Sequence, residues 1–142
     1  MAAVHDVAAY VLSKKSPITA MKLQKLLYYS QAWSLVWNDK PLFKARIEAW
    51  VNGPVVPEIY QYHRGKYEVT NWTRGDAGSL DARERRAVDA VLKFYGTKTS
   101  QWLSNLTHQE DPWIKARRGA LPGQQTQNEI TTAAMAEYYS SL

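Results

Sequence analysis

The sequence contains no cysteine among its 142 residues. This absence excludes disulfide bonds, thiolate nucleophiles and cysteine-ligated metals, and with them the class of small secreted proteins held together by disulfides. Long apolar runs are also missing, so the sequence predicts no membrane-spanning helix. The first residues, MAAVHDVAAYVLSKK, lack the basic start and the apolar run of a signal peptide. From these absences we expect a cytoplasmic protein.

Familiar catalytic motifs are missing as well. There is no Gly-x-Ser-x-Gly nucleophile motif, no glycine-rich phosphate loop and no zinc-binding His-Glu-x-x-His. His5 and His63 stand alone in the sequence, without the spacing of metal ligands. Acid–base groups crowd together only at His108, Glu110 and Asp111, where general acid–base chemistry is one interpretation. We favour the other, in which they cap a helix start and His108 bonds a buried backbone group. We therefore expect no enzymatic activity, no cofactor and no metal.

Phenylalanine is scarce, but the other aromatic residues are plentiful. The chain has two Phe against nine Tyr and six Trp. Tyr and Trp combine a large apolar surface with one polar group, and they are typical of half-buried positions and interfaces. The aromatic composition therefore favours a protein that acts by binding.

The excess positive charge lies in the first half of the chain. The formal net charge is +5, and residues 1–66 contain nine basic and four acidic residues, whereas residues 67–142 contain nine of each. Such an asymmetry can steer an acidic protein or a nucleic acid toward one side of a molecule. A solubilising surface is the simpler interpretation, because this net charge is ordinary for a small domain.

Residues 19–37, TAMKLQKLLYYSQAWSLVW, predict a helix at the centre of the fold. Their apolar side chains recur at helical spacing on nearly every side, and such a helix packs against several neighbours. One stripe contains Leu23, Leu26, Leu27, Ser30, Trp33 and Trp37, and the opposite side contains Met21, Tyr28, Ala32, Leu35 and Val36. Thr19 is placed to cap the first turn. We expect the remaining segments to wrap this helix.

Further helices are predicted on both sides of it. The spacing of residues 4–13 indicates a one-sided amphipathic helix, and Pro57 suits the first turn of a short helix ending near His63. Ser79 is the expected cap of a long helix that reaches Tyr95, with Asp81 near its positive end. Another short helix is expected over residues 100–106.

Two helix starts depend on local capping signals. One helix begins near residue 111, and either Thr107 or Asp111 could cap it. If Thr107 were the cap, Pro112 would lie where the helix needs an amide hydrogen. We favour Asp111 as the cap, because Pro112 then takes the first helical position. The segment Thr126-Gln127-Asn128-Glu129 has the pattern of a capping box and predicts a C-terminal helix beginning there.

The strand signals are few. Residues 44–51 alternate between apolar and polar side chains, and the turn Asn52-Gly53-Pro54 follows them. Residues 67–72 give a weaker strand signal. The sequence therefore predicts a mainly α, compact single-domain fold over residues 1–142, built around a central buried helix with a small β element near residues 44–56.

Aromatic and basic residues alternate in and beside the predicted strands. This composition is typical of a protein-binding hot spot, of a platform for single-stranded nucleic acid, or of a small core with a basic rim. The aromatic members are Trp50, Tyr60, Tyr62 and Trp72, and the basic members are Arg46, Arg64, Lys66 and Arg74. We select Trp50, Tyr62, Arg64 and Trp72 as the candidate residues for contact with a partner.

Residues 4–37 also suggest a helix–turn–helix, because two helices joined by a short turn lie in the basic half. Such a unit can place its second helix in the major groove of DNA. A recognition helix needs an exposed polar face, and we expect this helix to expose little beyond Lys22, Gln24, Lys25 and Gln31. DNA binding is therefore disfavoured.

Three motifs together carry a family resemblance. They are TAMKLQKLLYYSQAWSL at residues 19–35, IEAWVNGPVVPEIYQYHR at residues 47–64, and LTHQEDPWIKAR at residues 106–117. Their order and spacing resemble the Panacea domain of SocA-like and phage-associated GepA-like proteins, and the resemblance covers essentially the whole chain.

The resemblance implies the antitoxin of a type II toxin–antitoxin system, encoded by a bacterium or a prophage and acting in the cytoplasm. Such a domain neutralises its cognate toxin, for example a toxic small alarmone synthetase, by direct protein–protein binding, without catalysis or cofactor. One alternative is a proteolytic adaptor that delivers the toxin to the ClpXP protease, as described for one family member. The other is a DNA-binding regulator that uses the basic first half of the chain.

Overall fold

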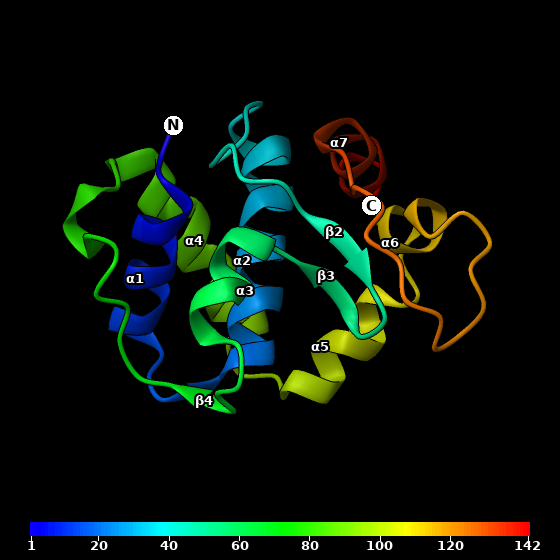
Figure 1. The fold of residues 1–142 in the computed structure, drawn as a ribbon. Coiled ribbons are helices and arrows are strands. Elements are labelled where there is room, and N and C mark those ends of the chain that lie inside the picture. Colours follow the sequence, from blue (N-terminus) through cyan, green and yellow to red (C-terminus); the bar gives the residue numbers. More distant parts are fainter.

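Helix α2, Ala20–Trp37, runs through the middle of the molecule, and the other elements lie around it (Figure 1). The computed structural model describes all residues from 1 to 142. Thr19 caps α2, since its hydroxyl accepts a hydrogen bond from the Lys22 backbone amide at 3.0 Å. Leu23, Leu26 and Leu27 are fully buried. The predicted central helix is therefore confirmed, although Trp37 is 50% exposed and does not join the buried stripe.

The remaining elements are short and mostly helical. The other helices are α1 (Val4–Lys14), α3 (Pro57–His63), α4 (Ala82–Tyr95), α5 (Ser100–Thr107), α6 (Asp111–Ala116) and α7 (Thr132–Ser140), with a 3-10 turn η1 (Ala77–Ser79). Strand β1 (Ile18–Thr19) pairs antiparallel with β4 (Glu68–Val69), and β2 (Glu48–Trp50) pairs antiparallel with β3 (Gly53–Val55). The expected mainly α fold with a minor β element is confirmed. No helix combines the length and the apolar character that crossing a lipid bilayer requires.

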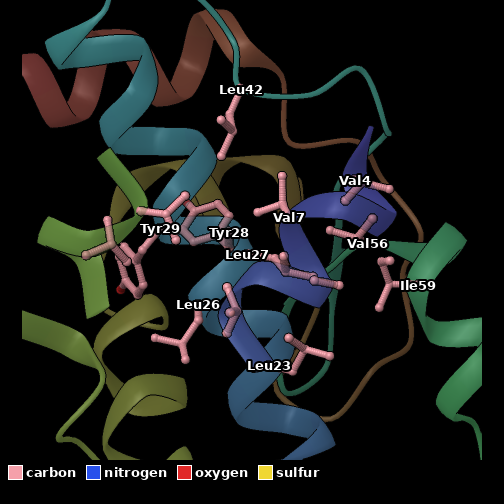
Figure 2. Packing of buried hydrophobic residues seen from close by; sticks show 14 of the residues in the cluster. Val4, Val7, Leu23, Leu26, Leu27, Tyr28, Tyr29, Leu42, Val56 and Ile59 are labelled. Atoms are coloured by element: carbon pink, nitrogen blue, oxygen red, sulfur yellow. The ribbon is translucent and has the colours of Figure 1, made fainter. Parts of the chain in front are cut away.

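The hydrophobic core surrounds α2 on several sides. Figure 2 shows Leu27 of α2 close to Val7 of α1, with Val56 and Ile59 from the start of α3 beside them. These side chains are at most 3% exposed, and burying each aliphatic side chain of this size contributes about 1.5–3 kcal/mol. Helices α4 and α7 cover further parts of α2. This packing explains why α2 has no continuous polar face.

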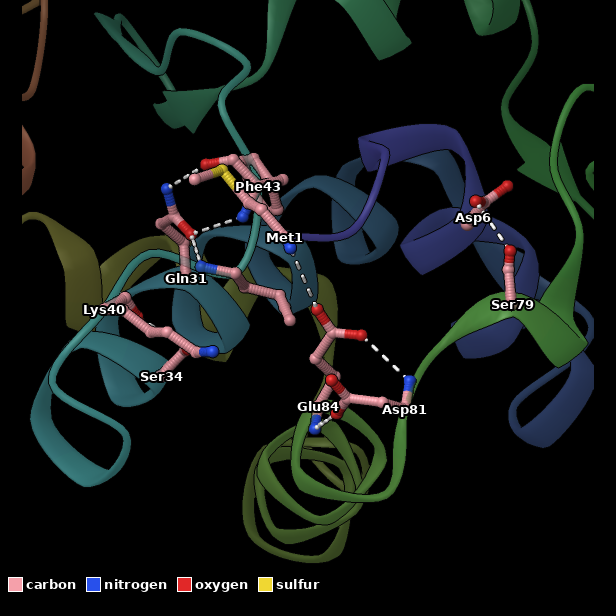
Figure 3. A network of polar contacts seen from close by, with 10 residues as sticks. Met1, Asp6, Gln31, Ser34, Lys40, Phe43, Ser79, Asp81 and Glu84 are labelled. Atoms are coloured by element: carbon pink, nitrogen blue, oxygen red, sulfur yellow. Dashed lines mark hydrogen bonds and ion pairs between the residues drawn. The ribbon is translucent and has the colours of Figure 1, made fainter.

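Three of the four polar side chains of α2 that were expected to face solvent lie inside the protein, and only Lys22 is partly exposed. Gln24, Lys25 and Gln31 are each at most 2% exposed. The Gln31 amide donates to the Phe43 carbonyl at 2.9 Å, and its oxygen accepts from the Leu42 amide at 2.7 Å (Figure 3). Buried backbone groups outside regular structure need such partners. Because α2 lacks an exposed polar face, it cannot serve as a DNA recognition helix.

The start of α4 differs from the prediction by two residues. Asp81, rather than Ser79, caps the helix: its carboxylate accepts from the Glu84 amide at 2.8 Å, and the Glu84 side chain accepts from the Asp81 amide at 2.9 Å (Figure 3). Ser79 ends η1 instead and donates to the Asp6 carboxylate at 2.9 Å. A reciprocal capping box satisfies two amides, whereas Ser79 could satisfy one.

The C-terminal helix begins later than its sequence pattern predicts. Residues Thr126 to Glu129 do not open α7, because they lie extended beside β2, where the Ala49 amide donates to the Asn128 carbonyl at 2.8 Å. Thr131 is the actual cap of α7. The predicted capping box is wrong because backbone groups of this segment form hydrogen bonds with the free edge of β2 and are not available to a helix. The predicted cap of helix α6 is wrong by one residue, because the helix begins at Asp111, with Glu110 at the cap position and Pro112 in the first turn.

A buried carboxyl group joins α7 to the core. Glu110, which is 7% exposed, accepts hydrogen bonds from the Tyr29 hydroxyl at 2.6 Å and the Tyr139 hydroxyl at 2.7 Å. Tyr28 and Tyr139 also share a hydroxyl–hydroxyl bond of 3.0 Å. Helix α7 therefore packs on the core of its own chain.

Candidate functional site

A groove of about 990 Å³ opens beside the N-terminal end of α2. It is lined by the first turns of α2 and α5, by the β2–β3 hairpin, and by α3 with the segment that follows it. In Figure 1 these elements surround the lower end of α2. The groove therefore lies where segments distant in sequence meet.

The lining of the groove is strongly cationic. Lys22, Lys25, Arg64 and Lys66 line it, and Glu68 is its single acidic residue. All four cations belong to the basic first half of the chain. The fold therefore places four of the nine basic residues of this half on one concave surface, where they can attract an anionic partner.

Lys25 is the most unusual member of this set. Its side chain is buried, and its ammonium group donates to the Pro54 carbonyl at 3.2 Å. None of the ion pairs in the protein includes it. Burial lowers the pKa of Lys25 from 10.5 to about 7, because a charged ammonium loses its hydration there. The groove thus contains a buried cation that has no acidic partner.

Gly53 makes room for Lys25 in the hairpin. Its φ is +121°, and a Cβ atom added there would lie 2.6 Å from Cε of Lys25. We expect Gly53→Ala to lower the free energy of unfolding by about 2–3 kcal/mol, through both strain and overlap. Gly65→Ala is the control, because Gly65 also has a positive φ, +85°, but no atom near its added Cβ; it should cost about 1 kcal/mol. Urea unfolding measures both, and equal losses would contradict the expected overlap of the added Cβ with Lys25 and with Oγ1 of Thr107, 2.9 Å away.

Gln24 and His63 fix α3 against α2 at the back of the groove. The Gln24 oxygen accepts from the Val56 amide at 2.8 Å, and its amide nitrogen lies 2.9 Å from Nε2 of His63. Because the Gln24 nitrogen can only donate, Nε2 of His63 accepts and the ring is neutral. Burial lowers the pKa of His63, and the charges of Lys25 and Lys66 lower it further. His63 therefore acts as a neutral structural group.

Aromatic side chains form the apolar part of the groove. Trp50 and Tyr60 pack edge to face with their ring centres 4.8 Å apart, and the Trp50 indole donates to the Glu48 carboxylate at 2.9 Å. Tyr67, at the rim, is 82% exposed. Apolar area beside cationic groups is what a recognition surface for a charged protein segment requires.

The four candidate residues predicted from the sequence fall into two places. Trp50 and Arg64 line the groove, whereas Tyr62 and Trp72 gather around His5 of α1. The Trp72 indole donates to Nδ1 of His5 at 3.0 Å, and Trp72 is only 9% exposed. Tyr62 is 37% exposed and contacts the same histidine ring. The four residues thus do not form one surface, and contact with a toxin stays a prediction for each of them.

Sequence reasoning missed Lys22 and Lys25 as members of a site. Both were assigned to an exposed helix face, where lysine is ordinary. The available signal was that Gln24 and Lys25 interrupt a helix that is otherwise apolar on nearly every side, since a polar residue at a core position needs a buried partner.

The predicted acid–base cluster does not converge on one point. Glu110 bonds the two core tyrosines, whereas Asp111 forms a salt bridge of 3.5 Å with Lys115 on the surface of α6. His108 stacks on Trp113 at 4.0 Å between ring centres. The expected capping role is wrong for Glu110, because its side chain bonds no helix amide. No three His, Asp or Glu side chains gather closely enough to hold a metal ion.

Comparison with known proteins gives the family. A family model described as "Antitoxin SocA-like, Panacea domain" matches residues 23–114. The chain belongs to this family. Antitoxin SocA of Caulobacter vibrioides (strain NA1000 / CB15N) is 44% identical over 110 residues, which cover 68% of this chain and 58% of that protein. The chain thus spans less than two thirds of its SocA relative, and no solved structure matches it. The matched Panacea region contains Lys25, Trp50, Arg64 and Lys66 of the groove.

Proposed function

We propose that this chain neutralises one cognate toxin protein by binding it directly, in the type II manner. The carrying observation is the match to the SocA-like antitoxin family over residues 23–114. The cationic, aromatic groove supports it, because its Trp, Tyr and Arg side chains are those that dominate protein interfaces. We extend the proposal to a toxic small alarmone synthetase as the partner, met in the cytoplasm.

We further propose that the Panacea domain comprises all of residues 1–142. Helices α1 and α7 lie wholly outside the matched region, yet Val7 and Tyr139 are at most 1% exposed in the same core as α2. Removing either helix would expose that core, so neither is expected to be dispensable.

Co-expression tests the proposed function. The product of the gene adjacent to this one should stop growth of a bacterial host when induced alone. Joint induction with this chain should restore colony counts to those of a host carrying empty vectors, because the bound toxin is held inactive. A neighbouring product that is harmless alone, or that stays toxic in the presence of this chain, would contradict the proposal.

An adaptor function shares the binding step but differs in its consequence. An adaptor for ClpXP would shorten the half-life of the toxin, and neutralisation would be lost in a host without ClpXP. Under direct blocking, the toxin accumulates in an inactive complex in both hosts. Immunoblotting of the toxin after translation is stopped distinguishes the two outcomes.

A further inference from the structure

We propose that the groove beside α2 recognises an acidic segment of the toxin. Some carboxylates of this segment bind Arg64 and Lys66 at the rim of the groove, and another lies over Lys25 at its floor. The inference rests on the proposed toxin-binding function and names the chemistry of the bound segment. It is carried by the charge of the groove, by the isolated cation within it, and by its shape.

The rim cations are free to bind a partner. Arg64 and Lys66 are exposed, and neither takes part in a salt bridge or a side-chain hydrogen bond of the protein. Arg46, in contrast, already binds Glu48 and Glu129 at 2.8 and 3.2 Å. The groove therefore combines unpaired positive charge with a single carboxylate of its own, which favours an anionic partner by charge complementarity.

The cation beneath the groove points to the same partner. Lys25 has one carbonyl partner on β3, and the titratable groups whose pKa its charge lowers are His63 of α3 and His108 at the end of α5. Lys22, one turn earlier on α2, donates to the Gly96 carbonyl at 2.7 Å. None of these groups is acidic. A carboxylate brought into the groove would therefore supply the missing counter-charge and favour the protonated form of Lys25.

The shape of the groove favours a peptide over a nucleic acid. Its 990 Å³ lies at the upper end of the range for compact small-molecule pockets, and it is open along the surface. Single-stranded nucleic acid needs a series of free aromatic faces for stacking. Trp50 and Tyr60 pack edge to face against each other, which leaves Tyr67 as the one freely exposed aromatic ring of the groove. Their combined apolar surface suits side chains placed between the acidic residues of a protein segment.

Charge reversal at the rim tests the proposal. In isothermal titration calorimetry, Arg64→Glu with Lys66→Glu should weaken binding of the toxin at least about tenfold. The control, Arg86→Glu with Lys93→Glu, alters the net charge equally at exposed positions of α4 outside the groove and should leave affinity within about twofold. Equal losses in both double variants would show that only the overall charge matters and would overturn the proposal. Circular dichroism verifies that each variant is folded.

Proton uptake gives a second, independent readout. At pH 7, titration in two buffers of different ionisation enthalpy should show that the wild-type protein takes up protons as the toxin binds, because burial leaves Lys25 only partly protonated in the free protein. Lys25→Met should remove this uptake while His63 and His108 remain. Unchanged uptake in Lys25→Met would overturn the placement of a carboxylate above Lys25.

The outcomes separate this inference from the proposed function. If the wild type neutralises the toxin and the rim double variant does so with unchanged affinity, the groove inference fails and the antitoxin function stands. If no neighbouring product is neutralised, the function fails, and a ten-residue glutamate-rich peptide replaces the toxin as probe. Binding of that peptide, lost in the rim variant, would support the groove. Preferential binding of single-stranded DNA or inorganic phosphate would overturn the acidic-segment proposal.

Discussion

Lys25→Met is expected to make the protein more stable, most strongly at and below pH 7. The pKa of Lys25 falls from 10.5 to about 7 on burial, which corresponds to roughly 4–5 kcal/mol of cost for burying the charge. Methionine has a similar length and no charge, but it leaves the Pro54 carbonyl without its bond, at a cost of about 1–3 kcal/mol. A net gain of about 1–4 kcal/mol is therefore expected at pH 6.

The pH dependence has a definite sign. Below about pH 7 both states carry the Lys25 proton, and the folded state bears the full cost of the buried charge. Between about pH 7 and 10.5 the unfolded state binds more protons, so this contribution to wild-type stability rises with pH. The advantage of Lys25→Met should shrink across this window and reverse at its upper end.

Urea unfolding between pH 6 and pH 10 measures this difference. Lys93→Met, at an exposed position of α4, is the control and should change stability by no more than about 0.5 kcal/mol at any pH. A difference between wild type and Lys25→Met that stays constant with pH would contradict the buried-cation account. The gain in stability should accompany a loss in toxin affinity, which is typical of residues retained for binding.

Glu110→Ala is expected to destabilise the protein by about 3 kcal/mol or more. The substitution leaves the buried hydroxyls of Tyr29 and Tyr139 without their acceptor and creates a void between α2 and α7. Because Tyr139 joins α7 to the core through this carboxyl group, helix α7 should lose hydrogen-exchange protection before the other helices.

Glu110→Gln is the matched variant for the Glu110 prediction. Burial raises the pKa of Glu110, although the bonds from Tyr29 and Tyr139 oppose the rise. Above about pH 4.5 the folded state therefore still holds a proton on Glu110 that the unfolded state has lost. The contribution of Glu110 to the free energy of unfolding then falls as pH rises through its raised pKa. Glutamine keeps an acceptor oxygen and does not ionise, so its stability relative to wild type should improve across that range. Equal destabilisation by alanine and glutamine would show that the acceptor is unimportant.

Local signals in the sequence predicted most helices, and they failed where a distant segment competed for the same groups. The apolar pattern of α2 was sufficient because its period is set by the helix itself. The capping box at Thr126 to Glu129 was misleading because the edge of β2, about 80 residues away along the chain, uses the backbone of this segment. Asp81 caps α4 in place of Ser79, because only Asp81 has a glutamate three residues later that completes a capping box.

The candidate site was less predictable than the fold. Trp50 and Arg64 were selected from an aromatic and basic pattern, and they line the groove. Trp72 matches the same pattern, yet it is buried against His5 because the loop after β4 returns to α1. Composition indicates that a residue suits an interface, but only packing decides whether its surface stays free.

The sequence by itself determined the central helix, the mainly α class and the family, because these depend on periodicities and motifs within continuous segments. Only the tertiary structure decided that Gln24, Lys25 and Gln31 turn inward. The physical reason is that each satisfies backbone groups of remote segments, at Val56, Pro54 and Phe43, which no local pattern of α2 contains. The same packing brought four of the nine basic residues of the first 66 together in one cationic groove.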